Sequence, residues 1–201
     1  MKKNWTKFLV VVLSVMMVFA MTACGGSSDS SDSSESAGAG TLYLGGIGPV
    51  TGAAALYGTA VKNGAQLAVD EINAANPDGV QVVWDMQDDE HDAEKAVNAF
   101  NALLDWGMQV SMSSVTSKPA EATSEINMEE RVFGMTPSAS STAVIEGKDN
   151  VLQMCFTDPN QGLASADYIS SQSLGTKIGV IYNNSDAYST GIYNAFKAEL
   201  E

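Results

Sequence analysis

The sequence predicts an α/β fold, a parallel sheet whose strands are joined by crossover helices, followed by the start of a second such unit. Two observations support this prediction. From Thr41 onward, short apolar runs alternate with stretches whose apolar residues recur at steps of three and four, which is typical of strands connected by amphipathic helices. Most of the runs are apolar enough to be strands covered on both faces. About 160 residues suffice for one core, and the last strand and helix predict a second.

Six strands and five helices are expected in alternation. The strands are predicted at residues 41–47, 80–86, 108–112, 132–135, 151–156 and 177–182. The first helix, from about residue 57 to Asn76, has its apolar stripe at Val61, Ala65, Ala68, Val69 and Ile72. The second has its stripe at Ala93, Ala96, Val97, Phe100, Leu103 and Leu104, and both stripes follow helical spacing.

Three shorter helices complete the series. They are predicted at about 119–130, from Pro159, and from about Tyr188 to the end. Asp158 is the expected N-cap of the second of these, with proline in its first turn. The last helix ends without a capping or turn residue, so the chain is expected to be the front part of a longer protein. Trp84 and Trp106 lie beside or within apolar stripes and are expected in the core.

The N-terminus predicts export. Three lysines, at positions 2, 3 and 7, precede an uncharged apolar run at 8–20, followed by Met21-Thr22-Ala23-Cys24. This order is typical of a secretory signal, and the run is shorter than the roughly 20 residues of a spanning helix. The end of the segment resembles the bacterial lipobox, which implies a signal peptide at 1–23 and a lipid on Cys24. An uncleaved membrane anchor is the alternative.

Residues 24–40 are predicted to be a flexible tether. Apart from Cys24 and Glu35 they are Ser, Asp, Gly and Ala, with no large apolar side chain, so they can bury little surface. A modification site on the serines is the alternative. After loss of residues 1–23, the chain keeps 7 basic and 24 acidic residues, a net charge of −17. Nucleic acid is not an expected partner, because binding phosphates requires a basic face.

Several catalytic and cofactor sites are disfavoured. The glycines near Gly48 lack the helix start and the acidic residue that a dinucleotide motif needs. The acidic run around His91 is either a solvated helix start or, less expectedly, a metal site, since no second histidine exists. His91 is also the sole candidate base for a hydrolase triad, and no glycine-flanked serine follows a strand. Cys155 is expected to be a buried inert thiol, with a reactive cysteine as the alternative.

The loops that follow the predicted strands carry small hydroxyl side chains and two tyrosines. They are 45–52 with Tyr57 after it, 113–117, 136–141, and 183–188 with Tyr188. In a parallel sheet, ligands bind beyond the carboxyl ends of the strands, where helix N-termini present free amides. Such loops can hold a carboxylate and pack a side chain against an aromatic wall. The sequence therefore predicts a small-ligand site.

From Leu42 to its end, the chain resembles the bacterial branched-chain amino acid-binding proteins of ABC transporters, the leucine/isoleucine/valine-binding type. The matching stretches are 46–52, 57–58, 63–65, 68–73, 88–89, 95–97, 136–139 and 158–162. The resemblance implies a type I periplasmic-binding-protein-like fold of two doubly wound lobes that close on a ligand. Residues 41–156 would form most of the first lobe, and 157–201 would begin the second.

The resemblance also implies the site. The residues that contact the carboxylate and ammonium groups of the ligand would be Thr116, Ser117, Ser138 and Ser140. Ser138 would act through its backbone carbonyl. Tyr57 would form the cleft wall of the first lobe, and Tyr188 that of the second. No cofactor, metal or catalytic residue is implied.

The resulting hypothesis is a lipid-anchored receptor, outside the cytoplasm, that delivers an amino acid to an ABC permease. The long tether favours a Gram-positive cell surface over a periplasm. Three alternatives remain: a sensory module of the same fold for a signalling partner, an exported enzyme, which is disfavoured, and a truncated fragment that binds nothing.

Overall fold

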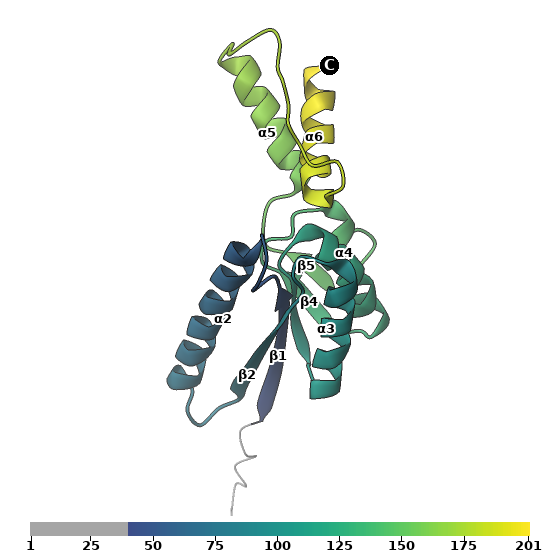
Figure 1. Cartoon of the computed structure of the whole chain (residues 1–201). Helices are drawn as coiled ribbons and strands as arrows, with labels where there is room; N and C mark the ends of the chain where they lie inside the picture. The colour runs from purple at the N-terminus through teal and green to yellow at the C-terminus, as the bar shows by residue number, and fades with distance from the viewer. Residues whose placement is uncertain (1–39) are drawn as a thin grey trace, which may run out of the picture. The chain divides into compact units, whose positions relative to one another are not determined.

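Five strands form one sheet in the order β2-β1-β3-β4-β5, and every pair is parallel (Figure 1). The computed structural model describes residues 40–201, so the predicted signal peptide, Cys24 and nearly all of the tether lie outside the described residues. The strands are β1 (Thr41–Gly48), β2 (Gln81–Asp88), β3 (Val110–Ser114), β4 (Phe133–Thr136) and β5 (Val151–Gln153). After β1 the chain moves first to one neighbour, β2, and then to the other, β3. This reversal creates a crevice at the carboxyl ends of β1 and β3, where open α/β sheets bind ligands.

The helices cover both faces of the sheet, so the predicted doubly wound α/β class is confirmed. The helices are α2 (Ala55–Ala75), α3 (Ala93–Trp106), α4 (Ser117–Glu129), α5 (Asp158–Ser171) and α6 (Ala187–Leu200), with a short 3-10 helix at Thr142–Val144. Helix α2 lies on one face, and α3 and α4 lie side by side on the other (Figure 1). All described residues belong to one compact unit. Among residues 40–201, no helix combines the length and apolarity needed to cross a bilayer.

The core lies between the sheet and the α3–α4 layer. Ile47 of β1 packs against Phe100 and Leu103 of α3, all three fully buried. A second cluster joins Ala120 of α4 to Val151 of β5. Helix α3 begins at Asp92, whose carboxylate accepts a hydrogen bond from the Lys95 amide at 2.9 Å, and it ends at Gly107 in the left-handed conformation. The predicted stripe of α3 is thus largely buried.

The predicted stripe of α2 is only partly correct. Ala65 and Val69 are buried, but Ala68 and Ile72 are exposed. Helix α2 packs mainly on β1 and β2, which is too narrow a surface to cover the whole stripe. The two predicted core tryptophans are half-buried: Trp84 lies over Gly46, and Trp106 packs edge-to-face on Tyr43.

Part of the sheet on the α2 side is uncovered. Gly134 of β4 lies against Asn127 of α4, so its neighbours Phe133 and Met135 point to the opposite face. Both are exposed, as is Leu152 of β5. The expectation of strands covered on both faces is therefore wrong for β4 and β5 among the described residues.

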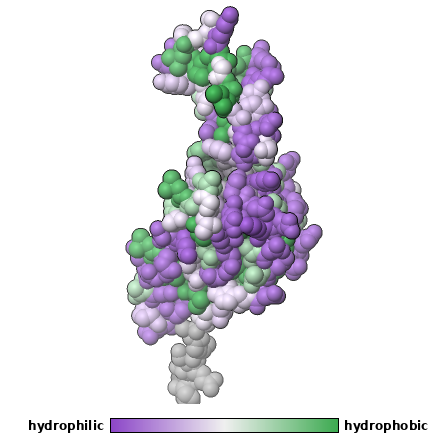
Figure 2. Space-filling model, in the orientation of Figure 1, coloured by the Kyte–Doolittle hydropathy of each residue, from purple (hydrophilic) through white to green (hydrophobic). Residues whose placement is uncertain are grey.

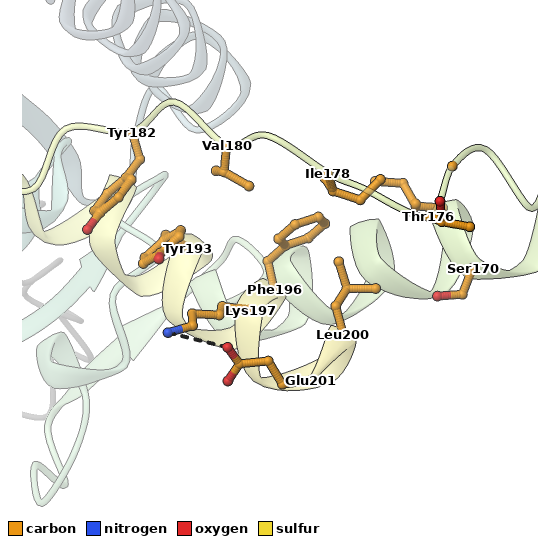
Figure 3. A pocket seen from close by; sticks show the side chains of 12 residues that line it. Ser170, Thr176, Ile178, Val180, Tyr182, Tyr193, Phe196, Lys197, Leu200 and Glu201 are labelled. Atoms are coloured by element: carbon orange, nitrogen blue, oxygen red, sulfur yellow. Dashed lines mark ion pairs between the residues drawn. The ribbon is translucent and has the colours of Figure 1, made fainter.

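The sixth predicted strand, at 177–182, does not form a strand in the structure. No described strand lies beside it to supply hydrogen-bond partners, and Ile181 is fully exposed. The segment crosses the α5–α6 pair, where Tyr182 stacks on Tyr193 with ring centroids 3.9 Å apart. Figure 2 shows hydrophobic residues gathered on this surface. They line a groove of about 490 Å³ that includes Phe196 and Leu200 (Figure 3).

The start of α5 differs from the prediction by one residue. Its N-cap is Thr157, whose hydroxyl accepts from the Asn160 amide at 3.4 Å, and Asp158 is the first helical residue. Threonine and aspartate are both favourable N-cap residues, so the sequence alone does not show which of the two caps the helix. Asp158 is instead buried against α6, where the carboxylate lies beside Gly191.

Candidate functional site

A cavity of about 390 Å³ opens at the carboxyl ends of the strands, a size ordinary for small-molecule sites. It is lined by the loops after β1, β2, β3, β4 and β5 and by the starts of α5 and α6. The lining residues are Ala54, Tyr57, His91, Val115, Thr116, Ser117, Ser138, Ser140, Cys155, Phe156, Gln161, Asp186 and Tyr188. The crevice expected from the strand order therefore contains a cavity.

Four helices begin at this cavity. Ala54 directly precedes α2, Thr116 precedes α4, Gln161 lies in the first turn of α5, and Asp186 precedes α6. The first amides of a helix have no partner within it and carry partial positive charge. Such ends bind anions such as phosphate or carboxylate. The cavity is thus suited to a negatively charged group.

All six residues predicted to contact a ligand line this one cavity. Tyr57 of α2 and Tyr188 of α6 are partly exposed, and the Tyr188 hydroxyl donates to Gln161 Oε1 at 3.4 Å. Because the two rings come from the two predicted lobes, they provide aromatic surface from both. Their ligand-binding roles remain predictions.

Two of the four predicted hydroxyl groups brace the loops. Ser117 Oγ accepts from the Ser140 and Ser141 amides at 3.1 and 3.3 Å. The Ser138 hydroxyl donates to the Val115 carbonyl at 2.6 Å, so its proton is already used. The loops after β3 and β4 are thereby joined, and the α4 N-terminus is held against them.

Thr116 is different, because its hydroxyl does not cap α4. Its Oγ1 lies 2.9 Å from Nδ1 of His91, a residue for which the sequence suggested only metal or hydrolase chemistry. On the other side of the imidazole, Nε2 lies 3.6 Å from Asp186 Oδ1. His91 and Asp186 are separated by 95 positions in the chain, and no sequence pattern connects them.

The acidic run around His91 builds a loop. Asp88 accepts from the Val50 amide at 2.9 Å and from the Thr51 hydroxyl at 2.5 Å, which fastens the loop after β1. Asp89 is fully buried and accepts from the His91 amide at 2.8 Å. Burial raises the pKa of Asp89 to about 6. Within residues 40–201, no cluster of His, Cys, Asp and Glu side chains is placed to hold a metal ion.

Cys155 also lines the cavity. Strand β5 ends at Gln153, so Cys155 lies beyond the strand and is only partly buried. Its thiol donates to the Ala139 carbonyl at 3.3 Å. Burial raises the pKa of the thiol, which keeps it protonated and slow to react. An inert thiol is therefore favoured over a reactive one, although it is not in the core.

The chain is similar in sequence to a protein family and to several named proteins. Residues 41–201 match the family described as periplasmic binding protein. The Leu/Ile/Val-binding protein BraC3 of Rhizobium johnstonii is 36% identical over 161 residues, which are 79% of this chain and 44% of that protein. Leu/Ile/Val-binding protein homolog 3 of Brucella melitensis is 33% identical with the same coverage. The chain spans about half the length of the curated relatives it matches.

Solved structures share the fold. The branched-chain amino acid transporter substrate binding protein LivJ of Streptococcus pneumoniae, in complex with isoleucine, superposes with a TM-score of 0.74 at 29% identity, covering 79% of this chain and 46% of that one. The leucine binding protein LivK of Thermotoga maritima gives 0.72 at 25% identity, with 79% and 45% covered. Since the sequence match extends over residues 41–201, the chain belongs to the periplasmic binding protein family, whose members are solute-binding receptors.

Proposed function

We propose that the protein is an extracytoplasmic receptor that binds a small carboxylate-bearing solute, an amino acid first of all, and delivers it to an ABC permease. The observation that carries this proposal is the meeting of four helix N-termini at one cavity of about 390 Å³. Side chains cap α5 and α6, whereas the starts of α2 and α4 have no side-chain cap, so their amides offer a site for a carboxylate. The names of the relatives support an amino acid, because they are Leu/Ile/Val-binding proteins.

The proposed contacts divide the ligand into a polar and an apolar end. Amides of α4, with Thr116, Ser117 and Ser140, bind the polar end, together with the backbone carbonyl of Ser138. Tyr57 and Tyr188 pack against the rest of the ligand, since an aromatic ring offers apolar surface with a polar tip. In this arrangement the protein binds and releases the ligand unchanged, without catalysis.

The two lobes and the anchor belong to the same proposal. Residues 41–156 form most of the first lobe, and 157–201 begin the second. Cys24 carries a lipid, and residues 24–40 form a tether. A receptor held to the same membrane as its permease is kept at a high effective concentration near it. The length of the tether favours a Gram-positive cell surface.

Calorimetric titration of the chain tests ligand binding. The panel is leucine, isoleucine, valine, alanine and threonine, with benzoate and 4-hydroxybenzoate as carboxylates that lack an ammonium group. We expect saturable binding of at least one amino acid and no turnover of it in the recovered solution. Binding of no amino acid, or chemical conversion of the ligand, would refute the receptor proposal. Binding of the aromatic acids alone would support the carboxylate site but identify aromatic acids, and not amino acids, as the ligand class.

Ser140→Ala tests the polar end of the site. Loss of a hydrogen bond to a charged ligand group costs about 1–3 kcal/mol of binding free energy. Ser165→Ala is the matched control, because Ser165 lies on the exposed side of α5 and donates only to the Gln161 carbonyl. Equal affinities for the two variants would remove Ser140 from the site.

Membrane attachment is tested independently of the ligand. In cells, the wild-type protein should incorporate radiolabelled palmitate and partition into detergent, and Cys24→Ser should do neither. Palmitate labelling of the Cys24→Ser variant would contradict lipidation at this position.

A further inference from the structure

His91 lies at the cavity on a backbone that few side chains adopt. Its φ is 65°, and Glu90 before it has a φ of 49°, so two consecutive non-glycine residues are left-handed. Such residues are uncommon and persist when their surroundings fix them, often at functional positions. Here the Glu90 amide donates to Asp88 Oδ1 at 3.0 Å and the His91 amide donates to Asp89 Oδ1 at 2.8 Å. The turn is held so that the imidazole faces the cavity.

The imidazole connects two residues that face the same hollow. Nδ1 lies 2.9 Å from Thr116 Oγ1, and Nε2 lies 3.6 Å from Asp186 Oδ1. That carboxylate oxygen is buried and has no hydrogen-bond partner among the described residues. The other oxygen of Asp186 accepts from the Ser189 amide at 2.9 Å and caps α6. Asp186 therefore presents one fixed, unpaired oxygen to His91.

We propose that His91 is a positioning residue that orients the Thr116 hydroxyl and thereby makes the cavity select ligands with an ammonium group. The Asp186 carboxylate favours the tautomer with its proton on Nε2. Nδ1 is then an acceptor, and the Thr116 hydroxyl must donate to it. The lone pairs of Thr116 Oγ1 are left for the ligand, so this oxygen accepts from an ammonium group and cannot donate to a carboxylate.

The charges near the imidazole also favour a ligand with an ammonium group. Asp186 and the buried Asp89 are the carboxylates that contact His91 through its side chain and its amide. The first amides of α4, which no side chain caps, follow Thr116 directly in the chain. The cavity therefore combines the Asp186 carboxylate with uncapped helix amides, which suits a zwitterion better than a simple carboxylic acid. This inference rests on the proposed function and names the chemical feature that the site selects.

The test compares leucine with 4-methylpentanoate, which is leucine without its ammonium group. Calorimetry on the chain should show that wild type binds leucine more tightly than 4-methylpentanoate. His91→Ala should lower that preference by roughly 5- to 10-fold. His91→Asn should retain part of it, since its Oδ1 can accept from Thr116. Glu90→Ala is the control, because Glu90 has the same backbone and an ion pair with Lys95 outside the cavity.

A double-mutant cycle separates positioning from mere support of the fold. If His91 acts through Thr116, Thr116→Val lowers the leucine preference in wild type and changes it little in the His91→Ala background. Additive effects would overturn the inference. If His91→Ala does not fold, His91→Gly takes its place, because glycine accepts the left-handed backbone.

The outcomes distinguish the two proposals. A wild type that binds no amino acid refutes the receptor function itself. A wild type that binds leucine and 4-methylpentanoate equally overturns the selection of an ammonium group. A leucine preference that is unchanged in His91→Ala overturns the role of His91 and leaves the receptor function standing.

Discussion

Gly191 of α6 lies directly against the Asp158 carboxylate at the start of α5, and a Cβ at position 191 would stand 2.8 Å from Asp158 Oδ2. Asp158 is almost fully buried, and burial raises the pKa of its carboxyl. The close approach of the two helices therefore depends on a missing side chain at one position and on a buried carboxyl at the other.

Gly191→Ala should destabilise the protein by about 1–3 kcal/mol, because the added methyl group displaces a packed carboxyl. Thermal unfolding followed by circular dichroism measures the loss. In an Asp158→Gly background, which removes both the carboxyl and the Cβ that would stand 2.9 Å from the added methyl group, the loss due to Gly191→Ala should shrink. An undiminished loss in that background would show that the contact with Asp158 is not its cause.

Gly58 makes a second close approach, in the first turns of α2. A Cβ there would overlap the Pro49 carbonyl, so Gly58→Ala should push α2 away from the loop after β1. We expect a loss of about 1–3 kcal/mol in unfolding free energy and weaker ligand binding, since Tyr57 is adjacent. Gly64→Ala is the control in the same helix: its Cβ meets open space, and it should stabilise α2 by roughly 0.5–1 kcal/mol. Equal effects of the two substitutions would contradict the steric argument.

The raised pKa of Asp89 predicts that the contribution of this residue to the free energy of unfolding falls as the pH rises from about 4 to about 6. Burial raises the pKa of this carboxyl from 3.8 to about 6, so within that window the folded state holds a proton that the unfolded state has released. By linkage, this group costs up to about 3 kcal/mol of stability above pH 6.

Asp89→Asn isolates this contribution, because its amide oxygen can still accept from the His91 amide. The unfolding free energy of the variant minus that of wild type, measured in urea at several pH values, should rise between pH 4 and pH 6.5. It should level off at higher pH. A difference that is flat across this range would show that Asp89 is ionised normally in the fold.

Cys155 should report on cavity occupancy. Its raised pKa and partial burial predict slower alkylation by iodoacetamide than in the urea-unfolded chain. A bound ligand should slow the reaction further, because the thiol faces the cavity. Mass spectrometry of the peptide that contains Cys155 follows its reaction separately from that of Cys24. Unchanged rates at a ligand concentration that saturates the chain by calorimetry would place the ligand elsewhere.

The sheet and the meeting of its loops could be predicted for one physical reason: the carboxyl ends of parallel strands share an edge, so the loops after them lie together. The choice of six residues within those loops came from the resemblance to the branched-chain amino acid-binding proteins. Strand limits were less accurate: β3 lies two residues later than predicted and β5 is shorter. Apolar runs indicate burial and do not show where ladder pairing begins.

What the sequence missed depends on tertiary structure. Nothing in the run that contains His91 signals a left-handed backbone, since glycine is absent from it, and nothing pairs it with Asp186. The segment at 177–182 has strand-like residues, but strand formation requires a neighbour that sequence cannot supply. Thr157 and Asp158 are both capping residues, and tertiary packing of Asp158 against Gly191 decided between them.

The main core and the cavity are built from different residues, which makes the protein a convenient starting point for changing specificity. The core side chains Ile47, Phe100 and Leu103 belong to a strand and a helix, whereas cavity residues such as Thr116 and Ser140 follow strand ends. Substitutions in the loops can alter recognition with little effect on the scaffold. A combinatorial library restricted to the cavity positions, with His91 and the loop-bracing Ser117 and Ser138 held constant, should therefore be rich in folded variants that differ mainly in what they bind.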